Sequence, residues 1–93
     1  MAKSKRPNMK QSKPYMRFAE EFITYTIEQL IELFNREVSN NGWTSMRAYH
    51  DTALMNEFIR RGVNVAAVYN GKVISFAYPI RYDDVENRLI SIK

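Results

Sequence analysis

Between Tyr15 and Val38 the apolar side chains recur every three or four positions, which is the period of one face of an α-helix. The main band of this face holds Met16, Ala19, Ile23, Ile27, Leu30, Phe34 and Val38. A flank that widens the band holds Phe18, Phe22, Tyr25 and Leu33. The apolar arc is therefore broader than the ~100° arc of an ordinary surface helix. The pattern predicts one long helix over 15–38, covered by its own domain on two sides or also facing another chain.

A second helix is predicted over about 44–61, after a polar stretch at 39–42 that ends the first. The apolar residues of this second segment do not form one clean stripe. Either the helix is covered on several sides, or it breaks near 50–52 with Asp51 as a new N-cap. Trp43, between the two helices, is expected to fold back onto them as a packing residue.

After residue 62 the apolar pattern changes to a period of two, which is typical of β-strands. Asn70 and Gly71 lie between two such runs and favour a two-residue type I′ hairpin turn. That turn pairs, for example, Ala67 with Ile74. The face of the hairpin expected to cover the helices consists of Val63, Val65, Ile74 and Phe76.

A third strand is predicted over 88–92, RLISI, after a turn of acidic residues. The expected fold class is α+β, with two helices followed by a three-stranded antiparallel β-meander. Residues 15–93 should form one domain, because a chain of 93 residues has too little interior for two. Residues 1–14 hold two prolines, repeated lysines and few apolar side chains, so we expect a disordered leader there.

The formal net charge of +4 is unevenly distributed. The first 17 residues hold six cations and no acid, whereas the remaining residues hold eight Lys or Arg against ten acids. Two interpretations of the basic leader are open, a solubilising tail or an arm that contacts nucleic-acid phosphates. The candidate nucleic-acid contacts are Lys3, Lys5, Arg6, Lys10, Lys13 and Arg17.

The composition excludes several classes of protein. There is no cysteine, so neither a disulfide framework nor a thiolate metal site exists. No stretch approaches the ~18 consecutive apolar residues of a membrane span, and the start lacks the apolar region of a secretory signal. We therefore expect a soluble, cytoplasmic protein without membrane attachment.

Candidate chemistry is sparse along the chain. The one histidine, His50, stands between Tyr49 and Asp51. Adjacent helical residues point about 100° apart, so this triplet is not expected to form a prearranged acid–base pair. A single histidine is also too few for a metal site, and no Gly-rich phosphate loop is present. We expect no catalytic, cofactor-binding or metal-binding residues, no small-molecule substrate and no enzymatic activity.

Two function classes remain. The first is a non-enzymatic protein-interaction or structural domain that forms a homodimer or binds another protein. The self-association surface would be the flank of the first helix, Phe18, Phe22, Tyr25 and Leu33. The alternative is a nucleic-acid-binding protein with the basic arm and a degenerate winged-helix-like body. Its recognition segment, 52–61, would be mostly apolar, whereas recognition helices usually present polar and basic side chains, so we rank interaction first.

Overall fold

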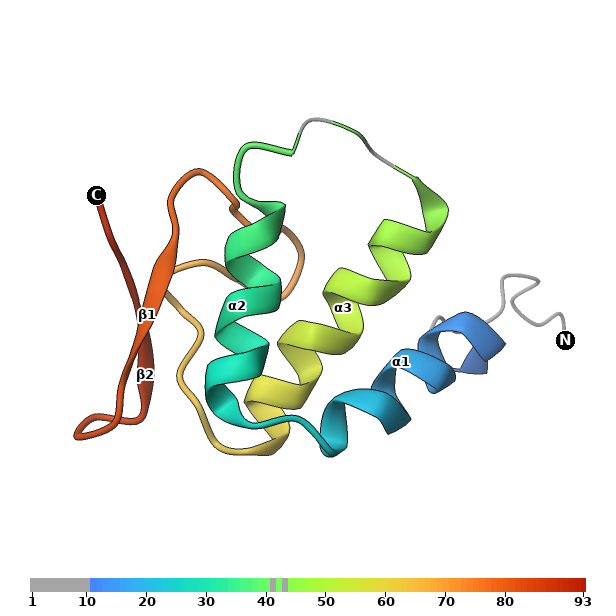
Figure 1. Cartoon of the computed structure of the whole chain (residues 1–93), viewed down its shortest axis with the longest axis horizontal. Coiled ribbons are helices and arrows are strands. Elements are labelled where there is room, and N and C mark those ends of the chain that lie inside the picture. The colour runs from blue at the N-terminus through green and yellow to red at the C-terminus, as the bar shows by residue number, and fades with distance from the viewer. Residues whose placement is uncertain (1–10, 41, 43) are drawn as a thin grey trace, which may run out of the picture.

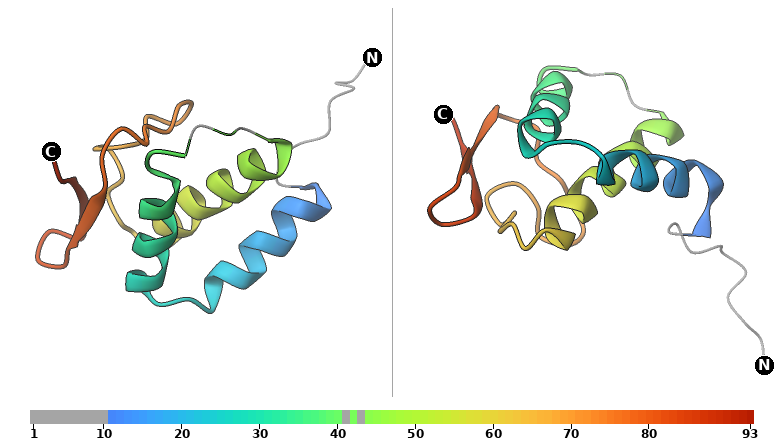
Figure 2. Two further views of the ribbon diagram at one scale, coloured as in Figure 1. Left: turned by 45° about the horizontal axis from the view of Figure 1, so that its top comes forward. Right: turned by 60° about the horizontal axis from the view of Figure 1, so that its bottom comes forward.

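The computed structural model describes residues 11–40, 42 and 44–93. This part of the chain forms three helices and two strands, in the order α1 (Lys13–Ile23), α2 (Ile27–Glu37), α3 (Ser45–Arg60), β1 (Ile80–Asp83) and β2 (Arg88–Ser91). From left to right, Figure 1 shows the β-hairpin, α2, α3 and α1, and Figure 2 shows α1 lying along α3. None of these helices is both long and apolar enough to cross a membrane. Trp43 and the leader cations Lys3, Lys5, Arg6 and Lys10 lie outside the described residues.

The predicted arrangement of two helices followed by a three-stranded meander was wrong, both in its helices and in its sheet. Over the described ranges there are three helices instead of two, and the sheet has two antiparallel strands instead of three. The fold is still a small α+β arrangement. The two errors come from one segment expected to be continuous helix and from one segment expected to be a hairpin.

The helix predicted over 15–38 is interrupted between Ile23 and Ile27, because Thr26 begins a new helix there. The Thr26 hydroxyl oxygen accepts a hydrogen bond from the Gln29 backbone N–H at 3.1 Å, and the Gln29 side-chain oxygen accepts one from the Thr26 N–H at 2.8 Å. This reciprocal pair is a capping box, which satisfies two helix-end donors at once. Thr24 ends α1 by donating its hydroxyl to the Glu21 carbonyl at 2.7 Å. The chain therefore turns a corner where the apolar period alone predicted a straight helix.

The first helix also begins earlier than predicted, at Lys13. Ser12 is its N-cap, and the Ser12 hydroxyl accepts a hydrogen bond from the Tyr15 N–H at 3.2 Å. Pro14 lies in the first turn, where its fixed φ suits a helix and its missing N–H costs no bond. Pro14, which falls within the predicted leader 1–14, is thus part of the helix.

The segment over 44–61 forms one continuous helix, α3, with Thr44 as N-cap. Asp51 is not a second N-cap but a buried residue in the middle of the helix. The helix is covered on several sides, which explains why its apolar residues form no single stripe. Its buried residues are Asp51, Ala53, Leu54, Met55, Glu57 and Phe58.

The residues predicted as the first two strands do not form a regular hairpin. A turn does occur at Asn70-Gly71, but the bridge beside it joins Tyr69 to Ile74 rather than Ala67 to Ile74. The Asn70 side-chain oxygen accepts hydrogen bonds from the backbone N–H groups of Lys72 and Val73, both at 2.8 Å, which makes a longer loop than a type I′ turn. Before it, the chain folds back on itself, because the Tyr69 N–H donates to the Val65 carbonyl at 2.9 Å.

The β-hairpin stands against α2, and the core lies between the helices and the segment that leads to it. Strands β1 and β2 pair antiparallel, with Ile80 opposite Ser91 and Tyr82 opposite Leu89. One extra bridge joins Asn64 to the start of β2. The buried core consists of Tyr15, Phe22, Leu30, Phe34, Ala53, Leu54, Met55, Phe58, Val63, Val65, Val68, Ile80 and Leu89.

Candidate functional site

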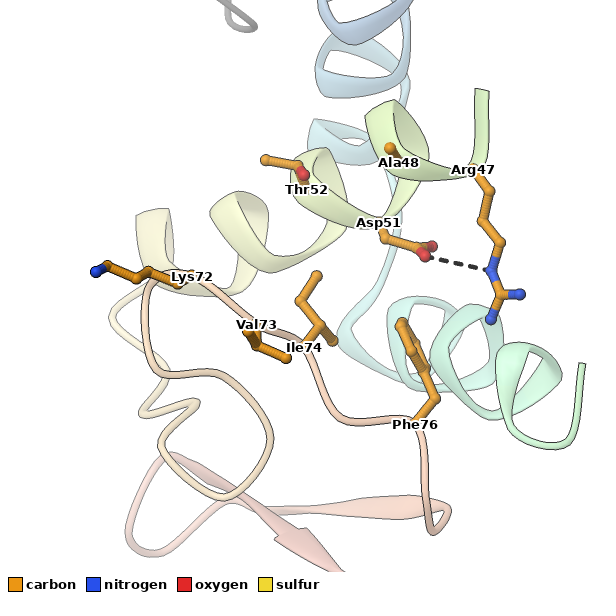
Figure 3. A pocket seen from close by; sticks show the side chains of 8 residues that line it. All are labelled: Arg47, Ala48, Asp51, Thr52, Lys72, Val73, Ile74 and Phe76. Carbon is orange, nitrogen blue, oxygen red and sulfur yellow. Dashed lines mark ion pairs between the residues drawn. The ribbon is translucent and has the colours of Figure 1, made fainter. Parts of the chain in front are cut away.

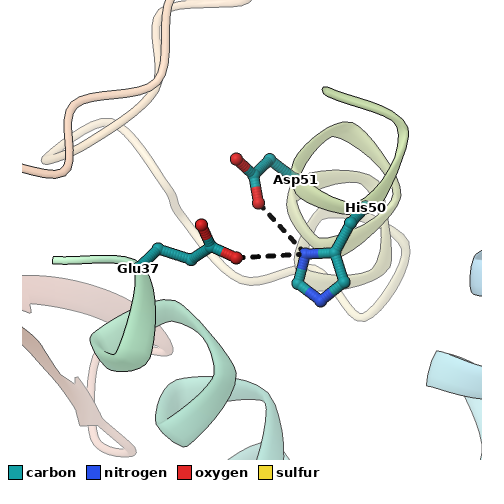
Figure 4. A group of neighbouring side chains, drawn as sticks. All are labelled: Glu37, His50 and Asp51. Atoms are coloured by element: carbon teal, nitrogen blue, oxygen red, sulfur yellow. Dashed lines mark hydrogen bonds and ion pairs between the residues drawn. The ribbon is translucent and has the colours of Figure 1, made fainter. Parts of the chain in front are cut away.

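Four ionisable side chains meet where the end of α2 lies beside the first half of α3, and we call Glu37, Arg47, His50 and Asp51 the polar cluster. The Arg47 Nε lies 2.5 Å from Glu37 Oε1 and 3.4 Å from Asp51 Oδ2. The His50 Nδ1 lies 3.0 Å from Asp51 Oδ1 and 3.5 Å from Glu37 Oε2. Figure 4 shows both carboxylates directed at the same ring nitrogen.

The His50 ring and the Asp51 carboxylate contact each other at 3.0 Å, although adjacent helical residues point about 100° apart. Nδ1 is the ring nitrogen nearer the backbone, so a short neighbouring side chain can reach it even on a helix. Glu37, the other carboxylate beside His50, comes from α2, and no local spacing in the sequence indicates that it lies next to His50 and Asp51. Only the packing of α2 against α3 brings these three side chains together.

Arg47 closes the carboxyl end of α2. Its guanidinium donates to the backbone carbonyl of Glu37 at 3.2 Å, to that of Asn40 at 2.8 Å and to that of Gly42. The last carbonyls of a helix have no partner within the helix, and a cation there also interacts favourably with the helix dipole. The same guanidinium lies over the Phe76 ring, 5.4 Å from its centroid. Arg47 therefore joins α2, α3 and the chain that follows them.

The polar cluster is a partly buried group of unbalanced charge. Burial raises the pKa of Glu37, and the neighbouring Asp51 carboxylate raises it further, while the charges of Arg47 and His50 act in the opposite direction. Two carboxylates and one guanidinium carry a formal charge of −1 when His50 is neutral, and of zero when it is protonated. The cluster thus has a place for one further positive charge.

A metal ion is one candidate for that charge. Glu37, His50 and Asp51 each offer a ligand atom, and these atoms lie within 4.8 Å of one another. Imidazole and carboxylate ligands suit zinc. However, the Arg47 guanidinium already contacts both carboxylates, and a divalent cation would displace it together with the cap of α2. The geometry favours an ion-paired helix cap over a metal centre.

His50 also has an aromatic environment. The rings of Phe18 and Phe22 meet it edge to face, with centroids 5.1 and 5.2 Å away. Both phenylalanines belong to α1, so the imidazole lies where all three helices meet. Within the described residues His50 has two hydrogen-bonding or ionic partners, Glu37 and Asp51. These contacts are those of a packing residue.

A second buried ion pair lies at the other end of α3. Glu57 is only 4% exposed and accepts hydrogen bonds from Arg60 at 2.7 and 2.9 Å and from Arg61 at 2.6 Å. The Arg61 guanidinium also donates to the carbonyls of Phe22 at 3.0 Å and Tyr25 at 2.6 Å. Arg61 therefore caps α1 as Arg47 caps α2, and α3 holds the ends of both preceding helices.

This second pair predicts an acid-sensitive contribution to stability. Burial alone would raise the pKa of Glu57, but the hydrogen bonds and charges of Arg60 and Arg61 outweigh it and lower the pKa from 4.5. A lowered carboxyl pKa stabilises the fold above the unfolded-state pKa, and this stability is lost as the pH falls through the folded-state value. We expect Glu57→Gln to reduce the loss of unfolding free energy between about pH 5 and pH 3 in urea titrations.

Glu37→Gln provides the control, because its effect on the pH dependence of stability should have the opposite sign. The raised pKa of Glu37 means that the native state binds its proton first. That residue therefore returns stability as the pH falls, and Glu37→Gln should make the acid loss steeper. If Glu57→Gln lost as much unfolding free energy between about pH 5 and pH 3 as the wild type, the stabilising role of the Glu57 ion pairs would be contradicted.

A cavity of about 420 Å³ opens beside the polar cluster, between α3 and residues 72–76 (Figure 3). Arg47 stands at one end, where it is ion-paired with Asp51, and Lys72 stands at the other. The size is that of a small-molecule pocket, but such a pocket needs a few convergent polar groups. Here the Arg47–Asp51 pair is already committed to the fold, so the cavity does not indicate a substrate class.

The predicted self-association flank makes contacts within the chain. Phe22 is 2% exposed. Phe18 stacks on it with centroids 5.9 Å apart, and Tyr25 meets it edge-on at 5.5 Å. Phe18, Tyr25 and Leu33 are partly buried against the core. Of the predicted nucleic-acid contacts, Lys13 and Arg17 lie exposed on α1.

The apolar surface that remains open on α1 is a different one. Met16 is 46% exposed and Ile23 is 52% exposed. The apolar period places both in the main band of the predicted helix. The break at residues 24–26 lets α1 turn relative to α2, so the bands of the two helices no longer face one way.

No family model matches this chain, and no curated protein or solved structure matches it either. What the chain does must therefore be inferred from its own contacts and surfaces.

Proposed function

We propose that this chain is a small non-enzymatic protein-interaction domain that self-associates through the outer face of α1. The observation that carries the proposal is the exposure of Met16 and Ile23. They are seven positions apart, which is close to two helical turns, so both lie on one side of α1. Burying one large apolar side chain contributes roughly 1.5–3 kcal/mol. A second copy is the partner that offers the same patch, because a two-fold contact is self-complementary.

The polar side chains support a non-enzymatic role. The groups most suited to acid–base chemistry are Glu37, His50 and Asp51, and each contributes to the junction of α2 and α3. Arg47 is held by three backbone carbonyls as well as by two carboxylates. A catalytic group must be free to exchange a proton or contact a substrate. These side chains act instead as parts of the fold.

The nucleic-acid alternative draws its support from the charge of the leader and from two exposed cations on α1, Lys13 and Arg17. The folded body supports it less. Recognition helices present a free face to the groove of DNA, whereas α3 is the most buried helix of the described fold. Its terminal cation Arg61 is bonded to carbonyls of the α1–α2 corner. We therefore rank self-association first.

The self-association proposal predicts the effect of a charge placed on α1. Ile23→Glu should lower the molar mass measured by light scattering at micromolar concentration to that of the 11.0 kDa monomer. Val85→Glu is the matched control, because Val85 is 85% exposed in the β1–β2 turn and should leave the mass of the wild type unchanged. Equal masses for Ile23→Glu and the wild type would overturn the proposal.

A further inference from the structure

We infer that a groove between α2 and β1 accepts an extended, basic segment of a partner protein as a third strand of the sheet. The groove lies on another surface than the α1 patch and does not depend on it. Its volume is about 400 Å³. The residues that line it are Glu28, Ile31, Ile80, Arg81, Tyr82 and Asp84.

At Ile80, the first residue of β1, the backbone edge that faces the groove is already hydrogen-bonded to α2. The Asn35 side chain donates to the Ile80 carbonyl at 3.0 Å and accepts from the Ile80 N–H at 2.8 Å. This pair of bonds is what a neighbouring strand would make to a strand residue. Asn35 of α2 thus takes the place of a third strand at Ile80, and the strand edge faces α2 there.

Two residues further along β1, the edge is open. In an antiparallel pair, successive residues direct their N–H and C=O groups alternately toward the partner strand and away from it. The Leu89 N–H donates to the Asn64 carbonyl at 2.9 Å, away from β1, so its opposite residue Tyr82 also points away from β2. The Tyr82 N–H and C=O therefore face the same side as those of Ile80. None of the described residues is hydrogen-bonded to them from that side.

A third strand would enlarge a small sheet. Each of its two strands has four residues, and a lone two-stranded hairpin is only marginally stable in water. Addition of an extended peptide to a sheet edge beside a helix is a recurrent mode of recognition, in which main-chain bonds supply affinity and side-chain pockets supply specificity. Ile31 of α2, which is half-buried, offers an apolar contact for a side chain of such a peptide.

The charges of the groove identify the chemistry of the partner. Glu28 on α2 and Asp84 after β1 are both exposed, and neither is in an ion pair within the described ranges. Arg81 also lines the groove, so its three charged side chains carry a formal charge of −1 together. The two carboxylates stand on its two walls, Glu28 on α2 and Asp84 after β1. A partner strand with a lysine or arginine between them is the complement.

The test titrates the full chain, labelled with ¹⁵N, with a capped hexapeptide of alternating valine and lysine. We expect the Tyr82 amide to shift and its hydrogen exchange to slow as the peptide binds. A matched peptide, N-methylated at the residues that face β1, keeps its side chains and charge but loses strand hydrogen bonding. It should bind about tenfold more weakly. Equal binding of the two peptides, or binding that leaves the Tyr82 amide unchanged, would overturn the inference.

A pair of charge variants tests the partner's chemistry. Glu28→Gln with Asp84→Asn should weaken binding of the unmethylated peptide about tenfold. The matched control is Glu20→Gln with Glu86→Gln, which removes two exposed acids outside the groove and should leave the affinity unchanged. Equal weakening by both double variants would show a general charge effect and overturn the assignment. Ile23→Glu, which disrupts the α1 patch, should bind as the wild type does, so this test and the mass measurement fail independently.

Discussion

Replacing Arg47 with methionine should lower the free energy of unfolding by about 3–5 kcal/mol, the usual cost of removing one partner of a buried ion pair. Methionine keeps much of the side-chain length but leaves Glu37 and Asp51 facing each other without a guanidinium. It also removes the donors for the Glu37 carbonyl at the end of α2 and for the carbonyls of Asn40 and Gly42 in the loop that follows. Urea titration monitored by circular dichroism at pH 7 provides the measurement.

Two further variants make this prediction specific. Arg36→Met removes a neighbouring arginine whose contact with Glu32, 3.9 Å long, is exposed, and should cost less than ~1 kcal/mol. Arg47→Lys should be intermediate, because an ammonium keeps the charge but cannot reach carbonyls and carboxylates together as the guanidinium does. If Arg47→Met were as stable as Arg36→Met, the polar cluster would not be the cap of α2.

The second large effect is expected at Arg61. Arg61→Met should lower the free energy of unfolding by about 2–4 kcal/mol, since hydrogen bonds that involve a charged group contribute about 1.5–3 kcal/mol each and not all are independent. The loss falls on the corner between α1 and α2, where the guanidinium donates to the carbonyls of Phe22 and Tyr25. Glu57 keeps its bonds to Arg60, so the cost should be smaller than for Arg47.

The neighbouring arginine is the natural comparison for Arg61. Arg60 pairs with the same carboxylate, but its side chain is 56% exposed and donates to no helix-end carbonyl of the described structure. Arg60→Met should therefore destabilise the protein less than Arg61→Met in the same urea titrations. The reverse order would mean that the buried carboxylate, rather than the α1–α2 corner, determines the effect.

Local sequence signals were sufficient for several elements. The two ends of α3, with its cap at Thr44 and its stop near Arg61, follow from capping and stop residues, whereas the pattern leaves its continuity through 50–52 open. The strand predicted over 88–92 is present as β2. The break before α2 also has a local signal, because Thr26 and Gln29 have the spacing of a capping box. A prediction from the apolar period alone misses that signal.

The failed hairpin has a different cause. Val63 and Val65 alternate as a strand would, but Val68 is buried as well, and this spacing fits a chain that folds back rather than an extended strand. The Asn70-Gly71 signal predicts a turn, and a turn is what it forms. A turn signal does not show whether the residues on either side of it pair as β-strands. Here their apolar side chains enter the helical core instead.

The candidate surfaces could be predicted least. Asn35 and Ile80 are 45 residues apart in the sequence, and no period or motif links them. In the sequence, Arg61 has the position of an ordinary helix-end cation, although the carbonyls that it bonds lie 36 to 39 residues earlier. Helical periodicity predicts that a side chain is covered but not by what. The Phe18 and Phe22 flank was therefore placed at an interface, whereas the structure places both rings against His50.

Sedimentation equilibrium of the full chain across the micromolar range tests the proposed interaction role most directly. If the outer face of α1 is a self-association surface, the mass should rise with concentration from 11.0 kDa toward twice that value. The rise should persist in high salt, because the patch around Met16 and Ile23 is apolar. A mass that stays at 11.0 kDa at every concentration would contradict the proposal.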